Sequence, residues 1–123
     1  MNRSLDDLDP RFREVAMALI ARCTEAEIPV RIIDTRRTAE EHADNLRRGA
    51  SWTAHSKHLD GLAIDICPYE SYVLHGANKL DWNADDPVWQ EIGQIGEELG
   101  LVWGGRWKQK DLGHFEMAAE AKA

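Results

Sequence analysis

The 123-residue chain has few of the features that mark disulfide-rich, membrane-spanning or nucleic-acid-binding proteins. It has only two cysteines, Cys23 and Cys67, each beside apolar residues, which argues against a disulfide framework and favours two small buried side chains. No apolar run approaches the length needed to span a membrane. Positive charge is also scarce, with 15 Lys and Arg against 22 Asp and Glu and a net charge of -7. We therefore expect no nucleic-acid partner and no membrane partner.

The first residues, MNRSLDDLDPRF, lack the positively charged start and apolar core of a signal peptide. We therefore expect synthesis in the cytoplasm, so that any action outside the cell needs another route of export. The composition, 43% hydrophobic and 30% charged, is ordinary for a globular protein. The length suffices for one hydrophobic core. The sequence predicts a monomer with a single domain over residues 1–123, in which 118–123 form a flexible tail.

Helix signals and short apolar runs follow each other irregularly along the chain. Three helices are predicted from N-terminal capping signals, at Asp9-Pro10, Thr38 and Asp86-Pro87. The second of them ends at Gly49 and the third at Gly100. Short strands are predicted at 30–33, 62–67, 101–103 and 114–117. Because the order is not a regular βαβ repeat, the expected fold is α+β, a short antiparallel sheet packed against about three helices.

Asp65 lies in the middle of an apolar run, Leu62-Ala63-Ile64-Asp65-Ile66-Cys67. A buried carboxylate is costly unless it is hydrogen-bonded, paired or bound to a cation. Taken alone, Asp65 is either a structural aspartate bonded to backbone amides or a functional group. His58 lies seven residues earlier, and Gly61 between them can supply the turn that brings the two side chains together. Imidazole and carboxylate suit zinc, although such a pair also occurs by chance.

A catalytic zinc site needs three protein ligands and one open position. The chain has five histidines: His42, His55, His58, His75 and His114. His42 in a predicted helix and His75 in a loop favour solvated side chains, while His55 stays a reserve candidate. His114 begins a predicted strand, three residues after Asp111. That carboxylate is either an ordinary turn residue or the general base that a metal-bound water would require.

Two segments together resemble a known family. The run Ser56-Lys57-His58-Leu59-Asp60-Gly61-Leu62-Ala63-Ile64-Asp65 is similar to the S-x-H-x-x-G-x-A-x-D signature of the D-alanyl-D-alanine carboxypeptidase family. The run Asp111-Leu112-Gly113-His114-Phe115-Glu116 resembles that family's closing (D/E)-x-x-H-(F/W) motif. The similarity is greatest to its phage endolysin branch, the L-alanyl-D-glutamate peptidases, with which 33–38 and 99–107 also agree. The resemblance covers the chain from the first helix to Met117.

The resemblance implies a mixed α+β fold that binds one zinc per chain on the sheet, through His58, Asp65 and His114. By the same similarity Asp111 is the general base and Arg37 is the cation near the scissile carbonyl.

Three further residues are candidates for contacts with substrate or with a metal ligand. Ser56 takes one of these roles by the resemblance. Glu116 either competes with Asp111 as the base or orients a ligand, because residues two apart on a strand face the same side. Trp103, like Trp52 and Trp107, either lines a substrate groove or packs in the core, whereas Trp89 on an apolar helical face favours the core.

The expected function is a zinc-dependent peptidase that cleaves peptidoglycan stem peptides at the L-alanyl-D-glutamate bond. By its likeness to phage lysis enzymes, it is expected to act on the cell wall after release through a holin. One alternative is a D-Ala-D-Ala carboxypeptidase or dipeptidase on the same scaffold. Another is a zinc-stabilised binding domain without catalysis. Arg37 and Asp111 favour an enzyme, because a structural metal site needs neither.

Overall fold

The computed structural model describes residues 3–36, 43, 47, 57–69 and 80–118. In chain order their elements are the 3-10 helix η1 (Leu5–Asp7), α1 (Pro10–Glu25), β1 (Val30–Asp34), the 3-10 helix η2 (Lys57–Asp60), β2 (Ala63–Pro68), α3 (Val88–Glu98), β3 (Leu101–Trp103), the 3-10 helix η3 (Gly104–Arg106) and β4 (His114–Met117). Of the predicted helix at 38–49, only residues 43 and 47 are described, and residues 70–79 also lie outside the described part of the chain.

Helix α1 begins as its sequence predicts. The Asp9 carboxylate accepts a hydrogen bond from the Arg11 amide at 2.9 Å, and Pro10 occupies the first turn, where its missing N–H costs nothing. Its buried residues recur at helical spacing and form one apolar face: Phe12, Ala16, Leu19 and Cys23. The prediction of a helix with one buried face is therefore confirmed.

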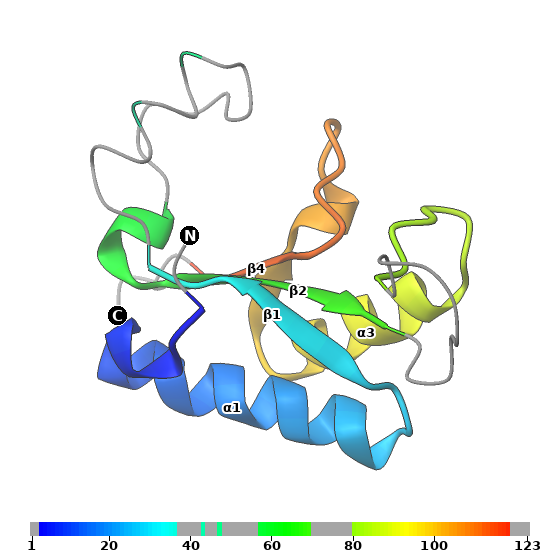
Figure 1. Cartoon of the computed structure of the whole chain (residues 1–123), viewed down its shortest axis with the longest axis horizontal. Helices are drawn as coiled ribbons and strands as arrows, with labels where there is room; N and C mark the ends of the chain where they lie inside the picture. Colours follow the sequence, from blue (N-terminus) through cyan, green and yellow to red (C-terminus); the bar gives the residue numbers. More distant parts are fainter. Residues whose placement is uncertain (1–2, 37–42, 44–46, 48–56, 70–79, 119–123) are drawn as a thin grey trace.

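The four strands form one antiparallel sheet in the order β1-β2-β4-β3, which confirms the expected sheet. Helices α1 and α3 lie on one side of it (Figure 1). Ile64, Ile66 and Phe115 are fully buried on that side, with the Phe115 ring against Gly96 of α3. Since side chains alternate along a strand, Asp65 and His114 lie on the opposite side of the sheet.

Helix α3 packs closely against β3 and β4. The Asp86 carboxylate accepts from the Val88 amide at 3.0 Å, so the predicted cap forms, and Trp89 is fully buried as expected. A Cβ at Gly93 would lie 2.3 Å from the Trp103 ring, so only glycine lets strand and helix approach this closely there. Two α-helices are thus described in full, against about three predicted.

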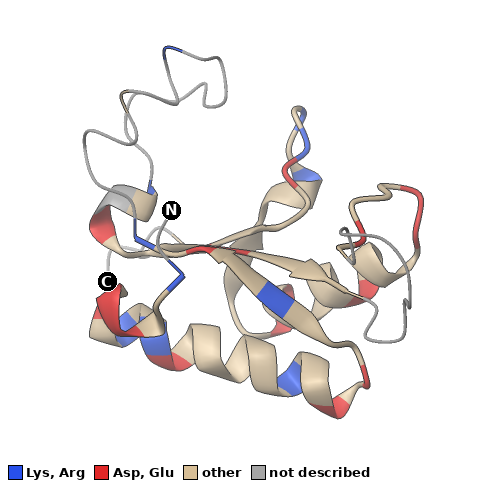
Figure 2. Ribbon diagram, in the orientation of Figure 1, with Lys and Arg blue, Asp and Glu red and all other residues tan. Residues whose placement is uncertain are grey.

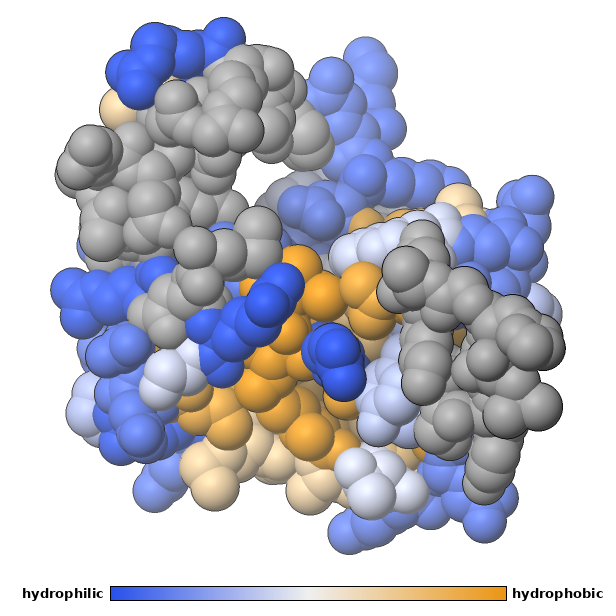
Figure 3. Space-filling view, viewed as in Figure 1, coloured by the Kyte–Doolittle hydropathy of each residue, from blue (hydrophilic) through white to orange (hydrophobic). Residues whose placement is uncertain are grey.

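Charged residues of both signs lie on the solvent side of α1 and in the loops, whereas the strands carry few (Figure 2). Hydrophobic surface is visible around β1, whose Val30, Ile32 and Ile33 are partly buried against the core (Figure 3). No helix among the described residues is both long and apolar enough to cross a membrane.

Candidate metal centre

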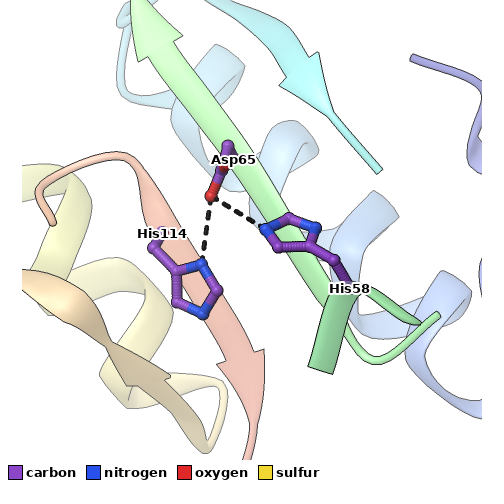
Figure 4. A group of neighbouring side chains, drawn as sticks. All are labelled: His58, Asp65 and His114. Carbon is purple, nitrogen blue, oxygen red and sulfur yellow. Dashed lines mark hydrogen bonds and ion pairs between the residues drawn. The ribbon is translucent and has the colours of Figure 1, made fainter. Parts of the chain in front are cut away.

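Three side chains converge on the side of the sheet that faces away from the helices. Asp65 of β2 and His114 of β4 are direct partners in the antiparallel register, so their side chains leave the sheet next to each other. His58 comes from η2, immediately before β2, and points toward the same carboxylate (Figure 4). Gly61, at φ 71°, ends η2, and a Cβ there would lie 2.8 Å from the Asp9 amide nitrogen. A tight turn packed against the start of α1 therefore positions His58.

The distances within this cluster suit a small metal ion. One ligand atom from each of His58, Asp65 and His114 lies within 4.8 Å of the other two. Asp65 Oδ1 is 3.3 Å from His58 Nε2 and 3.1 Å from His114 Nδ1. A tetrahedral zinc with bonds of about 2.0–2.1 Å separates its ligand atoms by roughly 3.4 Å. The two distances to Asp65 Oδ1 are therefore close to those around a tetrahedral zinc.

The outer nitrogens of both imidazoles have hydrogen-bond acceptors. His58 Nδ1 lies 2.6 Å from the Thr35 carbonyl oxygen, and His114 Nε2 lies 2.8 Å from Glu116 Oε1. A carbonyl or carboxylate can only accept, so each outer nitrogen carries a proton. In a neutral ring the inner nitrogen then turns a lone pair toward the Asp65 carboxylate. Such an arrangement requires positive charge between the groups, either a proton or a metal ion, and this donor set fits zinc.

The pKa values of the cluster also reflect the need for positive charge beside the Asp65 carboxylate. Burial opposes ionisation of Asp65, but hydrogen bonds from His114 and His58 outweigh it and hold its pKa well below the usual range. Burial likewise disfavours the charged form of His114, yet Asp65 and Glu116 raise its pKa to about 9. The pKa of Glu116 is lowered against the effect of its burial, by His114 first and then by Lys57. Without a metal, a proton on His114 therefore supplies the positive charge.

Asp111 lies beside the cluster and remains open to solvent. Its Oδ2 is 4.0 Å from His114 Nδ1, the inner nitrogen of that ring, and its side chain is 42% exposed. The Asp111 carbonyl accepts from the His114 amide at 3.2 Å, which ties the carboxylate to the start of β4. A carboxylate in this position can accept a proton from a water at the metal centre.

Glu116 occupies a different place. Its two oxygens lie 2.8 Å from His114 Nε2 and 3.2 Å from Lys57 Nζ, on the outer side of the imidazole. Both are therefore held away from the point where the three ligand atoms meet. This geometry suits the orientation of a ligand rather than proton transfer at the metal.

The segment between β3 and β4 is packed tightly beneath the site. A Cβ at Gly104 would lie 2.4 Å from the Asp111 carbonyl oxygen and 3.1 Å from the His114 Cβ. The Trp103 indole donates to the Leu112 carbonyl at 2.8 Å, and the Trp107 ring centroid lies 5.1 Å from that of His114. Glycine and tryptophan together fix the turn that carries Asp111.

The remaining candidate residues are not part of the cluster as the structure describes it. Trp103 is only 1% exposed and stacks on Phe115, which favours core packing, one of the two roles that its sequence position allows. Arg37 and Ser56 lie outside the described residues, as do the other candidate histidines: His42, His55 and His75.

Sequence reasoning missed two supports of the cluster. The Thr35 carbonyl is a backbone group, which leaves no side-chain signal. Lys57 forms an ion pair with Glu116, which lies far along the chain, so local sequence spacing could not reveal this contact.

The fold and the cluster define a small α+β domain with a His-Asp-His metal centre. The family described as D-alanyl-D-alanine carboxypeptidase matches residues 49–117, and the chain belongs to this family. That match includes the whole cluster and Asp111.

Named relatives agree with this assignment. An L-alanyl-D-glutamate peptidase of Listeria phage A118 is 37% identical over 82 residues, which are 65% of this chain but only 27% of that protein. The peptidoglycan L-alanyl-D-glutamate endopeptidase CwlK of Bacillus subtilis (strain 168) is 30% identical over 123 residues, covering 90% of this chain and 74% of the relative. The solved structure of the Serratia marcescens L-Ala D-Glu endopeptidase ChiX superposes with a TM-score of 0.69 at 25% identity, over 92% of this chain and 82% of ChiX.

Proposed function

We propose that this protein is a zinc-dependent peptidase that cleaves the stem peptide of bacterial peptidoglycan at the L-alanyl-D-glutamate bond. The observation that carries the proposal is the convergence of His58 Nε2, Asp65 Oδ1 and His114 Nδ1, with the exposed carboxylate of Asp111 beside them. Among the described residues the ligands are two imidazole nitrogens and one carboxylate, a set of three that is typical of catalytic zinc, whose fourth position takes water or substrate. The names of the phage and bacterial relatives support the choice of bond.

Each described residue has a distinct task in this proposal. His58, Asp65 and His114 hold the metal, and Thr35 and Glu116 fix the orientation of the two imidazoles. When bound, zinc lowers the pKa of a coordinated water to about 7 and polarises a carbonyl oxygen. Asp111 takes the proton from the attacking water and later gives it to the leaving amine.

Two further tasks rest on the resemblance alone. Arg37 stabilises the oxyanion that forms at the scissile carbonyl, and Ser56 contacts substrate or supports a ligand. We further propose that one catalytic domain acts as a monomer, reaches the wall after release through a holin, and needs no membrane or nucleic-acid partner.

A D-Ala-D-Ala carboxypeptidase is the second candidate, because the family description carries that activity. The two activities differ in product. Cleavage at L-alanyl-D-glutamate exposes a new amino terminus on D-glutamate, whereas a carboxypeptidase releases free D-alanine.

The test is digestion of purified peptidoglycan with the zinc-loaded protein, followed by mass spectrometry of the labelled amino termini. We expect new D-glutamate amino termini and no new reducing sugar ends, with a chelated sample and Asp111→Asn as controls. Free D-alanine would favour the carboxypeptidase. New reducing ends without new amines would make the protein a glycosidase and overturn the proposal.

A further inference from the structure

Lys57, the residue before His58, reaches the end of β4. Its Nζ lies 2.6 Å from the Met117 carbonyl oxygen and 3.2 Å from Glu116 Oε2. The backbone completes a cycle, because the Lys57 carbonyl accepts from the Leu62 amide at 3.0 Å and the Leu62 carbonyl accepts from the Met117 amide at 2.9 Å. The start of η2, the residue before β2 and the end of β4 are therefore joined by three hydrogen bonds.

The ion pair within this cycle connects Lys57 to the metal centre. Glu116 binds Lys57 with one carboxylate oxygen and the outer nitrogen of His114 with the other. The terminal torsion of a glutamate is broad, so a carboxylate with a single contact samples many orientations. A second, charge-assisted contact restricts that freedom. The Glu116 side chain is 16% exposed and that of Lys57 31%, so water screens the pair only in part.

We propose that Lys57 is a positioning residue that acts on the metal centre through Glu116. It holds the Glu116 carboxylate against His114 Nε2, so that Nδ1 of the same ring faces Asp65 and His58. Because Lys57 adjoins His58 in the chain, its contacts also fix the spacing between the two segments that carry the histidines. The inference rests on the zinc site of the proposed function.

The test measures the zinc dissociation constant by competition with a fluorescent chelator, for Lys57→Met, Glu116→Gln and the double variant. Loss of a group that orients a metal-binding histidine costs about 10–100-fold in affinity, and we expect Lys57→Met to fall at the lower end of that range. The double variant should match Glu116→Gln to within about twofold, since Lys57 acts through that carboxylate. Lys57→Arg, which keeps the charge and the donors, should restore affinity.

Lys108→Met is the matched control. Lys108 is an exposed lysine on the loop before Asp111, and its replacement should leave the zinc dissociation constant unchanged. The melting temperature of each metal-free variant is measured in parallel, to separate positioning from stability. Should Lys57→Met not fold, Lys57→Gln takes its place, because a neutral amide can still donate toward Met117 but cannot form the ion pair.

Three results would overturn the inference. The first is wild-type zinc affinity in the Lys57 variants. The second is an additive loss in the double variant, which would mean that Lys57 acts apart from Glu116. The third is a fall in the metal-free melting temperature that accounts for the loss of zinc and is not restored by arginine. If the wild-type protein bound no zinc, the proposed function itself would fail, which distinguishes the two failures.

Discussion

Strands β2 and β4 present two different faces, and neighbouring residues belong to opposite ones. Ile64 and Phe115 are fully buried against the helices, whereas Asp65 and His114, next to them in the chain, meet on the other side. The first pair belongs to the hydrophobic core. The second pair brings a carboxylate and an imidazole nitrogen close together, and this arrangement needs a proton or a metal ion between them. The two adjacent strands thus contribute to the hydrophobic core on one face and to the metal centre on the other. Substitutions on the two faces should therefore have separable effects.

The largest effect is expected for a substitution on the polar face, the side of β2 and β4 that carries Asp65 and His114. Asp65→Ala removes a carboxylate ligand and the negative charge between His58 and His114, so stoichiometric zinc and peptidase activity should both be lost. The protein should stay folded, because the core face of β2 is unchanged. Zinc content by mass spectrometry, activity and circular dichroism check this. An unfolded Asp65→Ala protein would show that the two faces are not separable.

On the core face, Phe115→Ala removes a fully buried ring that stacks on Trp103 and packs against Gly96. We expect the free energy of unfolding to fall by about 3–5 kcal/mol, measured by urea denaturation of the metal-free protein. The fraction that remains folded should still bind zinc, since His114 is held by its own contacts. A folded variant without zinc affinity would contradict the separation.

Asp111→Asn separates the contribution of the polar face to zinc binding from its contribution to catalysis. The substitution keeps the size of the side chain but removes its ability to accept a proton, so turnover should fall by roughly a hundredfold or more. Zinc content and melting temperature should hardly change, because Asp111 Oδ2 lies 4.0 Å from His114 Nδ1 and its side chain is 42% exposed.

Glu116→Gln is the matched comparison and should weaken zinc binding more than it slows cleavage per bound zinc. Single-turnover cleavage and zinc content are measured for both variants side by side. Near-normal cleavage by zinc-loaded Asp111→Asn, together with an inactive Glu116→Gln, would reverse the two assignments.

The smallest effect is expected for the two cysteines, which test how far solvent reaches along β2 and into the core. Cys67, two residues after Asp65, is fully buried, and burial raises the pKa of its thiol to about 12. Burial similarly raises the pKa of Cys23 to about 11. Neither thiol should react with iodoacetamide at pH 8 in the native protein, and both should react after denaturation. Rapid native labelling of Cys67, followed by mass spectrometry, would show that this end of the strand is also accessible.

Local signals predicted much of the fold. Asp9-Pro10 and Asp86 mark helix starts because capping depends on residues a few positions away. The short apolar runs predicted all four strands, with β2 beginning at Ala63 rather than Leu62. The strand order β1-β2-β4-β3 could not be predicted from periodicity, because pairing between distant strands depends on long-range packing.

The candidate site also divides into residues with a local sequence signal and contacts that depend on long-range packing. Asp65 was visible from the sequence because a carboxylate interrupts an apolar run, and the two motifs indicated His58 and His114. The Thr35 carbonyl and the contact between Lys57 and Glu116 had no such signal, since they depend on how η2 folds back over the sheet. The sequence does not decide whether Trp103 is buried, because a tryptophan beside a motif suits either a core or a groove, whereas the structure places it in the core.

A crystal structure of the zinc-loaded protein, with the metal located by its anomalous scattering, tests the central claim most directly. We predict one zinc per chain on the polar face, about 2.0–2.2 Å from His58 Nε2, Asp65 Oδ1 and His114 Nδ1, with a fourth position filled by water. Zinc held by a different set of ligands, such as one that includes Glu116 or His55 in place of these residues, would contradict the account.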